Sequence, residues 1–310
     1  MKRVKYFCNK DMRNKMKLKF LGLALFIVPA LIQAKVMLVV SSEDPSYQEI
    51  SASFKKSFSA QVEEHNLYGL EDEARKLGKS FVSYQPELLI VIGNLAAKMA
   101  KEYCSNCPVL YASASNSSLL KLSGAKVYGI SATPPASKIV ENIRLVFPEV
   151  KRVGLIYQPN STGKEVAQIQ SAATKAGLEF KAEAIAEMKE IPNALNRLLP
   201  QIELYLMLDD PAVITDDTFP FIFMNCFQKK IPIFTTSLNI VKKGALAGYA
   251  HNSAQLGSEL ASFANDILAQ KVSSGREKSI PAKLFLNQKV SQMWNFTFPD
   301  QATSQATIIQ

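Results

Sequence analysis

The stretch VMLVVSSEDPSY, residues 36–47, decides the fold of this chain. Its first five residues are apolar, the next five are small or polar, and a helical pattern begins at Tyr47. Residues 152–162, RVGLIYQPNST, repeat this order further along the chain. A buried strand that delivers small polar residues to a helix N-terminus is the first unit of a doubly wound α/β sheet. Two such units predict two similar lobes with a ligand cleft between them.

Residues 1–34 have the layout of a secretory signal peptide. Three lysines precede an apolar run from Phe20 to Ile32, and Ala34 ends a plausible cleavage site. The run is short, and a strand pattern follows it too soon for a membrane span. The long basic leader leaves open a translation start at Met12 or Met16. We therefore expect export to the periplasm and a soluble mature protein.

The basic character of the chain belongs to this leader. The chain has 36 Lys and Arg residues against 27 Asp and Glu residues, a formal net charge of +9. The leader holds eight of the basic residues and one acidic residue, so 28 and 26 remain after cleavage. No basic cluster with interleaved aromatic residues is left, and nucleic acid is therefore not an expected partner.

The remaining residues suffice for two domains of ordinary size. Apolar strands alternate with helical patterns, as is typical of parallel sheets covered by helices on both faces. The expected strands are residues 36–40, 61–68, 88–92, 109–112, 126–131, 152–157, 178–185, 203–208, 231–236 and 283–286. We assign residues 35–131 and 239–280 to lobe 1, and residues 132–238 and 281–299 to lobe 2. Residues 300–310 are polar and unpatterned, which predicts a disordered tail.

Five short segments match motifs of one known family in order and spacing. FPEVKRVGLIY, residues 147–157, is similar to the family segment LPGVKRVGVIY. Further matches are GNLAA at 93–97, GALAGY at 244–249, the IP and LN pairs within 280–287, and WNFTFP at 294–299. They resemble the ABC-transporter substrate-binding family, whose members include tryptophan- and tyrosine-type binding proteins. The resemblance implies the type I periplasmic-binding-protein fold: two Rossmann-like lobes, three crossovers and a ligand between the lobes.

Polar residues follow several of the predicted strands and are expected to face one crevice. Helix N-termini offer unpaired amides and a positive dipole end, which suit a carboxylate. Gly93 would let the backbone approach a ligand, and Asn94, Leu95 and Ala96 would then offer their amides. Serine hydroxyls are expected to join them at the same rim, from Ser41, Ser42, Ser113, Ser115 and Ser237.

The opposite side of the expected cleft offers a negative charge. Asp209 and Asp210 end a predicted strand, and a carboxylate there suits a ligand ammonium group. Tyr47 and Tyr157 lie near strand-to-helix junctions, where their rings can stack on an apolar or aromatic side chain. This set predicts a zwitterionic amino acid with a bulky or aromatic side chain as the ligand.

Each candidate also has a purely structural interpretation. Serines after strands commonly cap helices, and an aspartate before a proline can cap the next helix. The tyrosines can pack against a hinge, and Gly93 can serve helix–strand packing. The family register favours Asp209 over Asp210 as the ligand contact.

Cys104 and Cys107 form a CxxC pair after a predicted helix and before a strand. A redox CxxC places its first thiol at a helix N-terminus, so the order here is reversed. A structural disulfide in an oxidising compartment is the first interpretation, two free thiols the second, and a catalytic dithiol the third. Cys226 is expected to be a buried helix residue. These three cysteines do not make a zinc site.

The sequence carries no G-x-S-x-G, H-E-x-x-H or Walker A motif, and its histidines are His65 and His251. We therefore expect a non-enzymatic, monomeric solute-binding protein without cofactor or metal. It would present a small-molecule ligand to an inner-membrane ABC permease by closure of its lobes. Two alternatives stay open: a ligand-presenting sensor subunit for a receptor, and a periplasmic thiol oxidoreductase that uses the CxxC pair.

Overall fold

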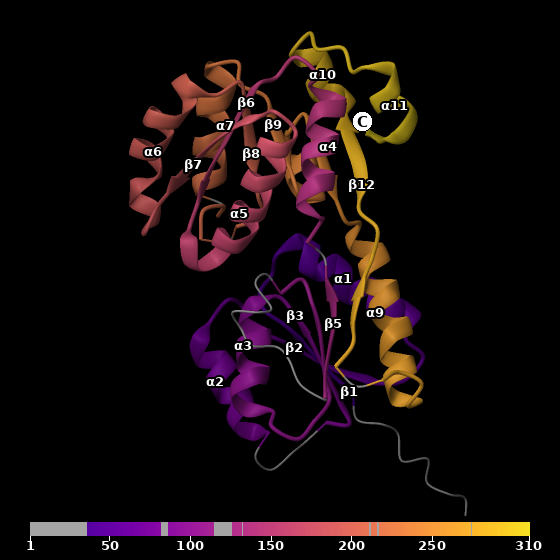
Figure 1. Cartoon of the computed structure of the whole chain (residues 1–310). Coiled ribbons are helices and arrows are strands. Elements are labelled where there is room, and N and C mark those ends of the chain that lie inside the picture. The colour runs from indigo at the N-terminus through magenta and orange to yellow at the C-terminus, as the bar shows by residue number, and fades with distance from the viewer. Residues whose placement is uncertain are drawn as a thin grey trace, which may run out of the picture. The chain divides into compact units, whose positions relative to one another are not determined.

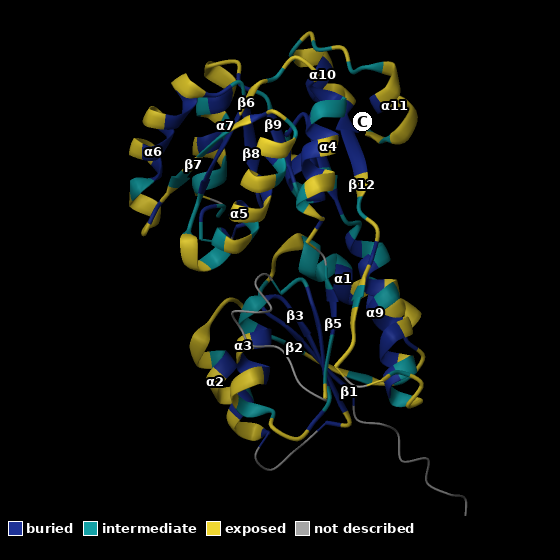
Figure 2. Ribbon diagram, in the orientation of Figure 1, coloured by how far each residue is buried: buried dark blue, intermediate teal, exposed yellow. Residues whose placement is uncertain are grey.

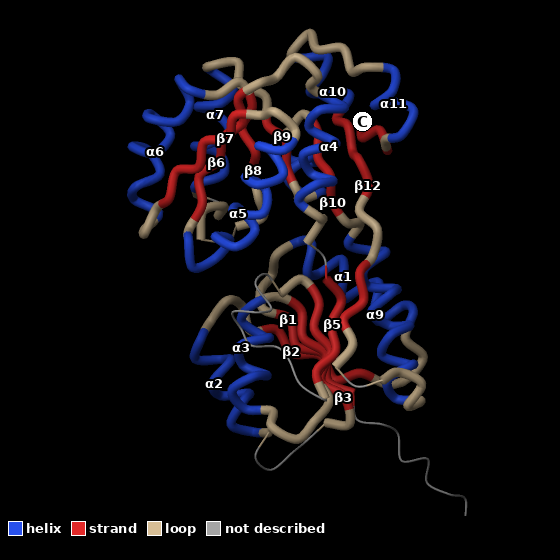
Figure 3. The backbone as a smooth tube through the Cα atoms, viewed as in Figure 1, coloured by secondary structure: helices blue, strands red, loops and turns tan. Residues whose placement is uncertain are grey.

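Two β-sheets organise the part of the chain that the structure describes (Figure 3). The structure is a computed structural model, and it describes residues 36–81, 86–114, 126–131, 133–210, 212–215, 217–273 and 275–310. Residues 33–310 belong to one structural unit. The predicted signal peptide, residues 1–34, and the candidate Ser115 lie outside the described residues.

The first sheet has six parallel strands in the order β11-β5-β4-β3-β1-β2. The strands are β1 (Val36–Val40), β2 (Val62–Asn66), β3 (Leu88–Ile92), β4 (Val109–Ala112), β5 (Val127–Ser131) and β11 (Glu277–Ser279). The helices of this lobe are α1 (Pro45–Ser57), α2 (Glu71–Ser80), α3 (Asn94–Tyr103) and α9 (Ser253–Leu268). In β1, Leu38 and Val40 share a core with α1 and α9, whereas Met37 and Val39 share one with α2 and α3. A central parallel strand is apolar throughout because helices cover both of its faces.

The second sheet has seven strands in the order β13-β12-β10-β9-β8-β6-β7. The strands are β6 (Arg152–Tyr157), β7 (Glu179–Ala184), β8 (Leu204–Met207), β9 (Ile233–Thr235), β10 (Ala247–Ala250), β12 (Lys283–Asn287) and β13 (Thr307–Ile309). The helices of this lobe are α4 (Ala136–Val146), α5 (Pro159–Lys175), α6 (Ile191–Leu198), α7 (Thr218–Gln228), α8 (Leu238–Lys243), α10 (Gln288–Met293) and α11 (Asp300–Gln305). Strands β10 and β12 pair antiparallel, and the other neighbouring strands run parallel. In both sheets the strands are mostly buried and the outer faces of the helices are exposed (Figure 2).

The chain passes between the two sheets three times (Figure 1). Strand β5 leads to α4, β10 leads to α9, and β11 leads to β12. The boundary that we placed at residue 239 is wrong, because α8 and β10 both pack with the second sheet and the crossing follows Ala250. The small apolar residues of 245–249 suit either sheet. The antiparallel pairing of β10 with β12 places this segment in the second sheet, and the sequence pattern does not reveal that pairing.

The tail predicted to be disordered is ordered. Residues 300–305 form α11, and residues 307–309 form β13, which extends the edge of the second sheet beside β12. Ala302 of this segment is fully buried in the core of that lobe. The segment is polar because it contributes one anchoring side chain and the backbone hydrogen bonds of an edge strand, neither of which needs an apolar run.

Candidate ligand-binding site

A cavity of about 180 Å³ lies where the carboxyl ends of strands from both sheets meet. The first lobe lines it with Ser42, Asp44, Tyr47, Ser113 and Ala114. The segment after β5 and the second lobe contribute Thr133, Pro134, Glu165, Asp209, Ile214 and Thr236. An adjoining cavity of about 510 Å³ shares four of these residues and adds Ser237, Asn239 and Lys243, among others. Crevices at the carboxyl ends of parallel strands are the usual ligand sites of such sheets.

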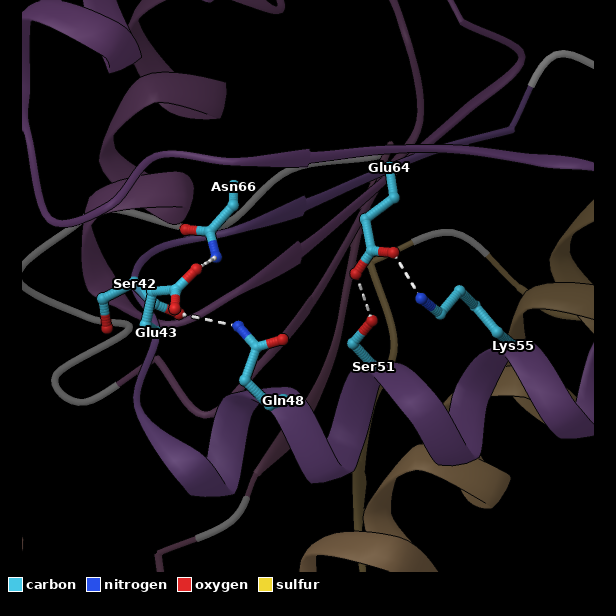
Figure 4. Close-up of polar contacts among 7 residues, drawn as sticks. All are labelled: Ser42, Glu43, Gln48, Ser51, Lys55, Glu64 and Asn66. Atoms are coloured by element: carbon cyan, nitrogen blue, oxygen red, sulfur yellow. Dashed lines mark hydrogen bonds and ion pairs between the residues drawn. The ribbon is translucent and has the colours of Figure 1, made fainter.

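The turn after β1 is held in place by polar contacts with neighbouring elements (Figure 4). Gln48 Nε2 donates to the carbonyl of Ser42 at 3.2 Å, and Asn66 Nδ2 donates to Glu43 Oε1 at 3.2 Å. Further along α1, Ser51 and Lys55 both contact the carboxylate of Glu64 on β2. These bonds fix α1 against β2 and so fix the residues that face the cavity.

Asp44 begins helix α1. Its Oδ1 accepts from the backbone amide of Ser46 at 2.8 Å and from the Ser46 hydroxyl, while Pro45 occupies the first helical position. An aspartate cap followed by proline is a favourable helix start. The Ser46 hydroxyl also accepts from Asn239 Nδ2 of α8 at 3.0 Å, a direct hydrogen bond between the lobes. Asp44 thus combines a structural role with a place on the cavity wall.

Tyr47 lies over Gly93 at the end of β3. A Cβ atom at Gly93 would come within 2.8 Å of the Tyr47 ring and 2.6 Å of Ser41 Oγ. The φ of Gly93 is +87°, a conformation that favours glycine. Burial raises the pKa of the Tyr47 phenol, and the negative charges of Asp209 and Asp44 raise it further. The phenol therefore stays protonated and is a hydrogen-bond donor at the cavity.

The adjacent residues Asp209 and Asp210 have different environments. Asp210 is buried, and its carboxylate accepts from Gln158 N at 3.1 Å, Thr162 Oγ1 at 2.6 Å and Ala212 N at 3.0 Å. Asp209 lines both cavities and is open to water there, with protein atoms of both lobes around it. The surrounding protein removes part of its hydration, and this loss, together with the charges of Asp44 and Asp210, raises its pKa to about 6. Asp210 is a structural residue, and Asp209 is available to a ligand.

Glu165 lies on α5 and was not among the predicted site residues. Among the described residues it makes no hydrogen bond or ion pair, although it lines the cavity. Burial raises its pKa to about 7, and the charges of Asp209 and Asp210 add to the shift. It lies one helical turn after Thr162, which binds Asp210, but this contact is tertiary and the sequence alone gave no signal for it.

The cavity brings together part of the predicted set. Ser42, Tyr47, Ser113 and Asp209 line the first cavity, and Ser237 lines the adjoining one. Ser113 has a φ of +50°, an uncommon conformation for a residue with a side chain. The lining residues of the first cavity that the prediction did not name are Asp44, Ala114, Thr133, Pro134, Glu165, Ile214 and Thr236.

The predicted carboxylate site at the start of α3 does not line the cavity. Ser41 is buried, donates to the Ile92 carbonyl at 2.7 Å and accepts from the Ala96 amide at 2.9 Å, so both groups are already satisfied. Leu95 lies in a separate small cavity between α2 and α3. Asn94 has a buried Oδ1 without a partner among the described residues, and it too is absent from the cavity wall. In this structure Ser41 already binds the Ala96 amide, and residues 93–96 line neither of the two larger cavities.

Tyr157 packs in the core of the second lobe and does not line either cavity. Cys104 and Cys107 are joined in a disulfide with a Cα–Cα distance of 5.9 Å, away from the cavity lining. Cys226 is free and buried, and burial raises its pKa to about 12. His251, at the crossing from β10 to α9, has its pKa lowered to about 4 by burial and is therefore neutral.

No three His, Cys, Asp or Glu side chains of the described residues group in a way that could hold a metal ion. None of the described helices is long and apolar enough to cross a membrane.

The geometry of two Rossmann-like sheets with a polar cavity between them agrees with comparisons to known proteins. The family described as "ABC transporter substrate binding protein" matches residues 43–309. The chain belongs to this family. A tyrosine-binding protein from Clostridioides difficile (strain R20291) is 22% identical over 272 residues, which are 85% of this chain and 76% of that protein. The family resemblance inferred from the five sequence segments is thus confirmed.

Solved structures of the substrate-binding fold superimpose on most of the chain. The ABC domain in complex with L-Trp from Streptococcus pneumonia has a TM-score of 0.78 and 21% identity, covering 90% of this chain and 100% of that one. The ligand-free, open structure of a substrate-binding protein with adhesive properties from Clostridium difficile has a TM-score of 0.71 and 18% identity, covering 89% and 99%. The predicted α/β class with two Rossmann-like lobes of the type I periplasmic-binding-protein fold is confirmed.

Proposed function

We propose that this substrate-binding protein captures a small molecule with a protonated amine and delivers it to an inner-membrane ABC permease. The ligand would have the size of an amino acid with a bulky or aromatic side chain. The names of the relatives, which refer to tyrosine and L-Trp, support this size class. The predicted signal peptide supports work in the periplasm, where such a protein would meet its permease.

The observation that carries the proposal is the position of Asp209. Its carboxylate lines both cavities and has no hydrogen bond or ion pair with another described side chain. The neighbouring Asp210 is fully engaged within the protein, so the second lobe leaves one carboxylate for a ligand at this turn. A partly desolvated carboxylate in a cavity is stabilised most effectively by an ammonium group.

Closure of the lobes would follow from the way the wall is divided between them. Asp44 and Tyr47 belong to the first lobe, and Glu165 and Asp209 to the second. A ligand that contacts both groups stabilises the arrangement in which they are close, and so shifts the population toward the closed state. The three chain crossings between the sheets are the segments that would bend.

A thermal-shift screen of the purified protein against amino acids and small amines tests the proposal. We expect a concentration-dependent rise in melting temperature with at least one amine-bearing compound, because a ligand that binds only the folded state stabilises it. The same compound should have a smaller effect on an Asp209→Ala variant. If anionic or neutral compounds stabilise the protein and amine-bearing ones do not, the proposed function is wrong.

A further inference from the structure

We propose that the ligand carries a net positive charge and that its recognition does not require a carboxylate. The inference rests on the proposed function and specifies its substrate class: an organic amine or diamine is favoured over the corresponding zwitterionic amino acid. Three observations support it: the charges on the cavity wall, the absence of partners for these charges, and the loss of the expected anion sites.

The cavity wall is acidic. Asp44, Glu165 and Asp209 line the cavity of about 180 Å³. Its described lining contains no Lys, Arg or His. The adjoining cavity includes Lys243, whose Nζ lies 5.6 Å from the centroid of the Phe219 ring, and it adds Glu43 on the acidic side. A zwitterion would bring its own carboxylate into this negative field.

The cavity carboxylates lack the partners that acidic groups have elsewhere in the described chain. Glu183 is bound by Arg197 at 2.7 Å, and Glu203 by Arg152 at 2.9 Å. Glu165 and the Asp209 carboxylate have no such partner within the described segments, and Asp44 uses only Oδ1 for its helix cap. Like charges without a counter-charge repel one another, and a ligand cation between them would remove that repulsion.

Three helix N-termini that follow strand ends already bind an acceptor from the protein itself. The start of α1 is capped by Asp44, the Ala96 amide of α3 by Ser41, and the Gln158 amide at the start of α5 by Asp210. The backbone at Gly93 is in addition covered by the Tyr47 ring. At each of these three starts, one backbone amide that could bind a ligand carboxylate is therefore already bound inside the fold.

The metal-ion alternative has less support. No grouping of three potential metal ligands exists among the described residues, so the three carboxylates are too far apart to share one small ion. Carboxylates spread over a cavity wall suit an extended organic cation, whose charges can be separated by several bonds.

Protonation links the cavity charges to pH. The pKa values of Asp209 and Glu165 are raised to about 6 and about 7. The groups that face them are the Asp44 and Asp210 carboxylates and the protonated Tyr47 phenol, with Lys243 in the adjoining cavity. A bound cation favours the ionised carboxylates and must displace their protons. Binding should therefore strengthen as the pH rises from about 5 to about 8.

The test compares matched pairs of compounds that differ only by a carboxylate. Tyrosine and tyramine, tryptophan and tryptamine, lysine and cadaverine, and arginine and agmatine are titrated into the purified protein by isothermal calorimetry at pH 7.5. In any pair that binds, we expect the amine to bind at least about tenfold more tightly than its amino acid. Tighter binding of the amino acid would overturn this inference and leave the proposed function standing. If no member of any pair binds, both fail.

Variants assign the effect to the cavity charges. Glu165→Gln should weaken binding of the preferred amine at least about tenfold, because it removes a partly buried counter-charge and keeps the shape. Asp44→Asn offers an independent test, since asparagine also caps helices and the fold is preserved. Glu149→Gln, at an exposed position outside the cavity lining, is the matched control and should bind like the wild type. Unchanged amine binding in both cavity variants would overturn the inference.

Discussion

The two strand-to-helix turns that the sequence repeats have different roles in the structure. The turn between β1 and α1 places Ser42, Asp44 and Tyr47 on the cavity wall. The turn between β6 and α5 places none of its residues there, because Gln158 and Thr162 bind the buried carboxylate of Asp210. The second lobe instead supplies its cavity residues from the turn after β8 and from α5. Equivalent positions in two similar lobes are thus used once for ligand access and once for stability.

The largest expected effect is on ligand affinity, and it tests whether Asp209 of the second lobe binds the ligand. Asp209→Ala should weaken binding of an amine-bearing ligand by about 2–5 kcal/mol, because an enclosed ammonium group loses its counter-charge. Calorimetry with the compound found by screening measures this loss. Wild-type affinity in the variant would show that the amine is held elsewhere.

The next effect is on protein stability, and it tests the structural role of the buried Asp210. Asp210→Ala should lower the free energy of unfolding by about 3 kcal/mol, because three donors from Gln158, Thr162 and Ala212 lose a buried charged acceptor. Urea denaturation followed by circular dichroism gives the value. Asp209→Ala is the control in the same experiment and should not destabilise the unliganded protein. Equal stability of the two variants would remove the distinction between these neighbours.

A smaller effect is expected where the first turn meets β3. Gly93→Ala should lower the free energy of unfolding by about 1–3 kcal/mol, since a Cβ would clash with Tyr47 and Ser41 and the backbone has a positive φ. Gly163→Ala on α5 is a suitable control, because the nearest atom to its new Cβ would be 3.8 Å away. A Gly93→Ala protein as stable as the control would mean that Tyr47 is not packed against this backbone.

The smallest effect concerns the pH dependence of Glu165. Its pKa in the folded protein, about 7, lies above the usual carboxyl value, so the folded state holds its proton more tightly than the unfolded state. This contribution is present at low pH and is lost as the pH rises from about 4.5 to about 7. Glu165→Gln should therefore match the unliganded wild type at pH 4.5. At pH 8 it should exceed the wild-type stability by about 1 kcal/mol, less than the roughly 3 kcal/mol of the full shift, because the side chain is partly exposed to water. Denaturation at the two pH values measures the difference, and a gap that does not grow with pH would contradict it.

Much of the fold could be predicted from the sequence, because buried parallel strands are continuous apolar runs. Residues 36–40 and 88–92 were predicted with the bounds that the structure shows. The second crossing and the tail were predicted wrongly, because β10 and β13 are placed by their pairing with β12 and carry no periodic signal of their own.

The residues of the ligand-binding cavity could be predicted from the sequence only in part. Asp209 and Asp210 were singled out because they end a predicted strand, and the family register favoured Asp209, which does line the cavity. The amides after Gly93 were expected to face a ligand, but Ser41 binds the Ala96 amide and the Tyr47 ring lies over Gly93, and such contacts depend on side-chain packing across strands. Glu165 lies within a helix and meets Asp44 and Asp209 at one cavity only through the tertiary structure. Sequence patterns identify strand ends well, but they do not show which polar groups are already hydrogen-bonded within the fold.

The central claim, that a ligand joins the carboxylates of the two lobes, is tested most directly by small-angle X-ray scattering. The radius of gyration is measured with and without a saturating amount of the ligand found by screening, for the wild type and for Asp209→Ala. We expect the ligand to compact the wild type and the variant to stay as extended as the unliganded protein, even at ligand concentrations that saturate it. Equal compaction of the variant and the wild type would contradict the claim.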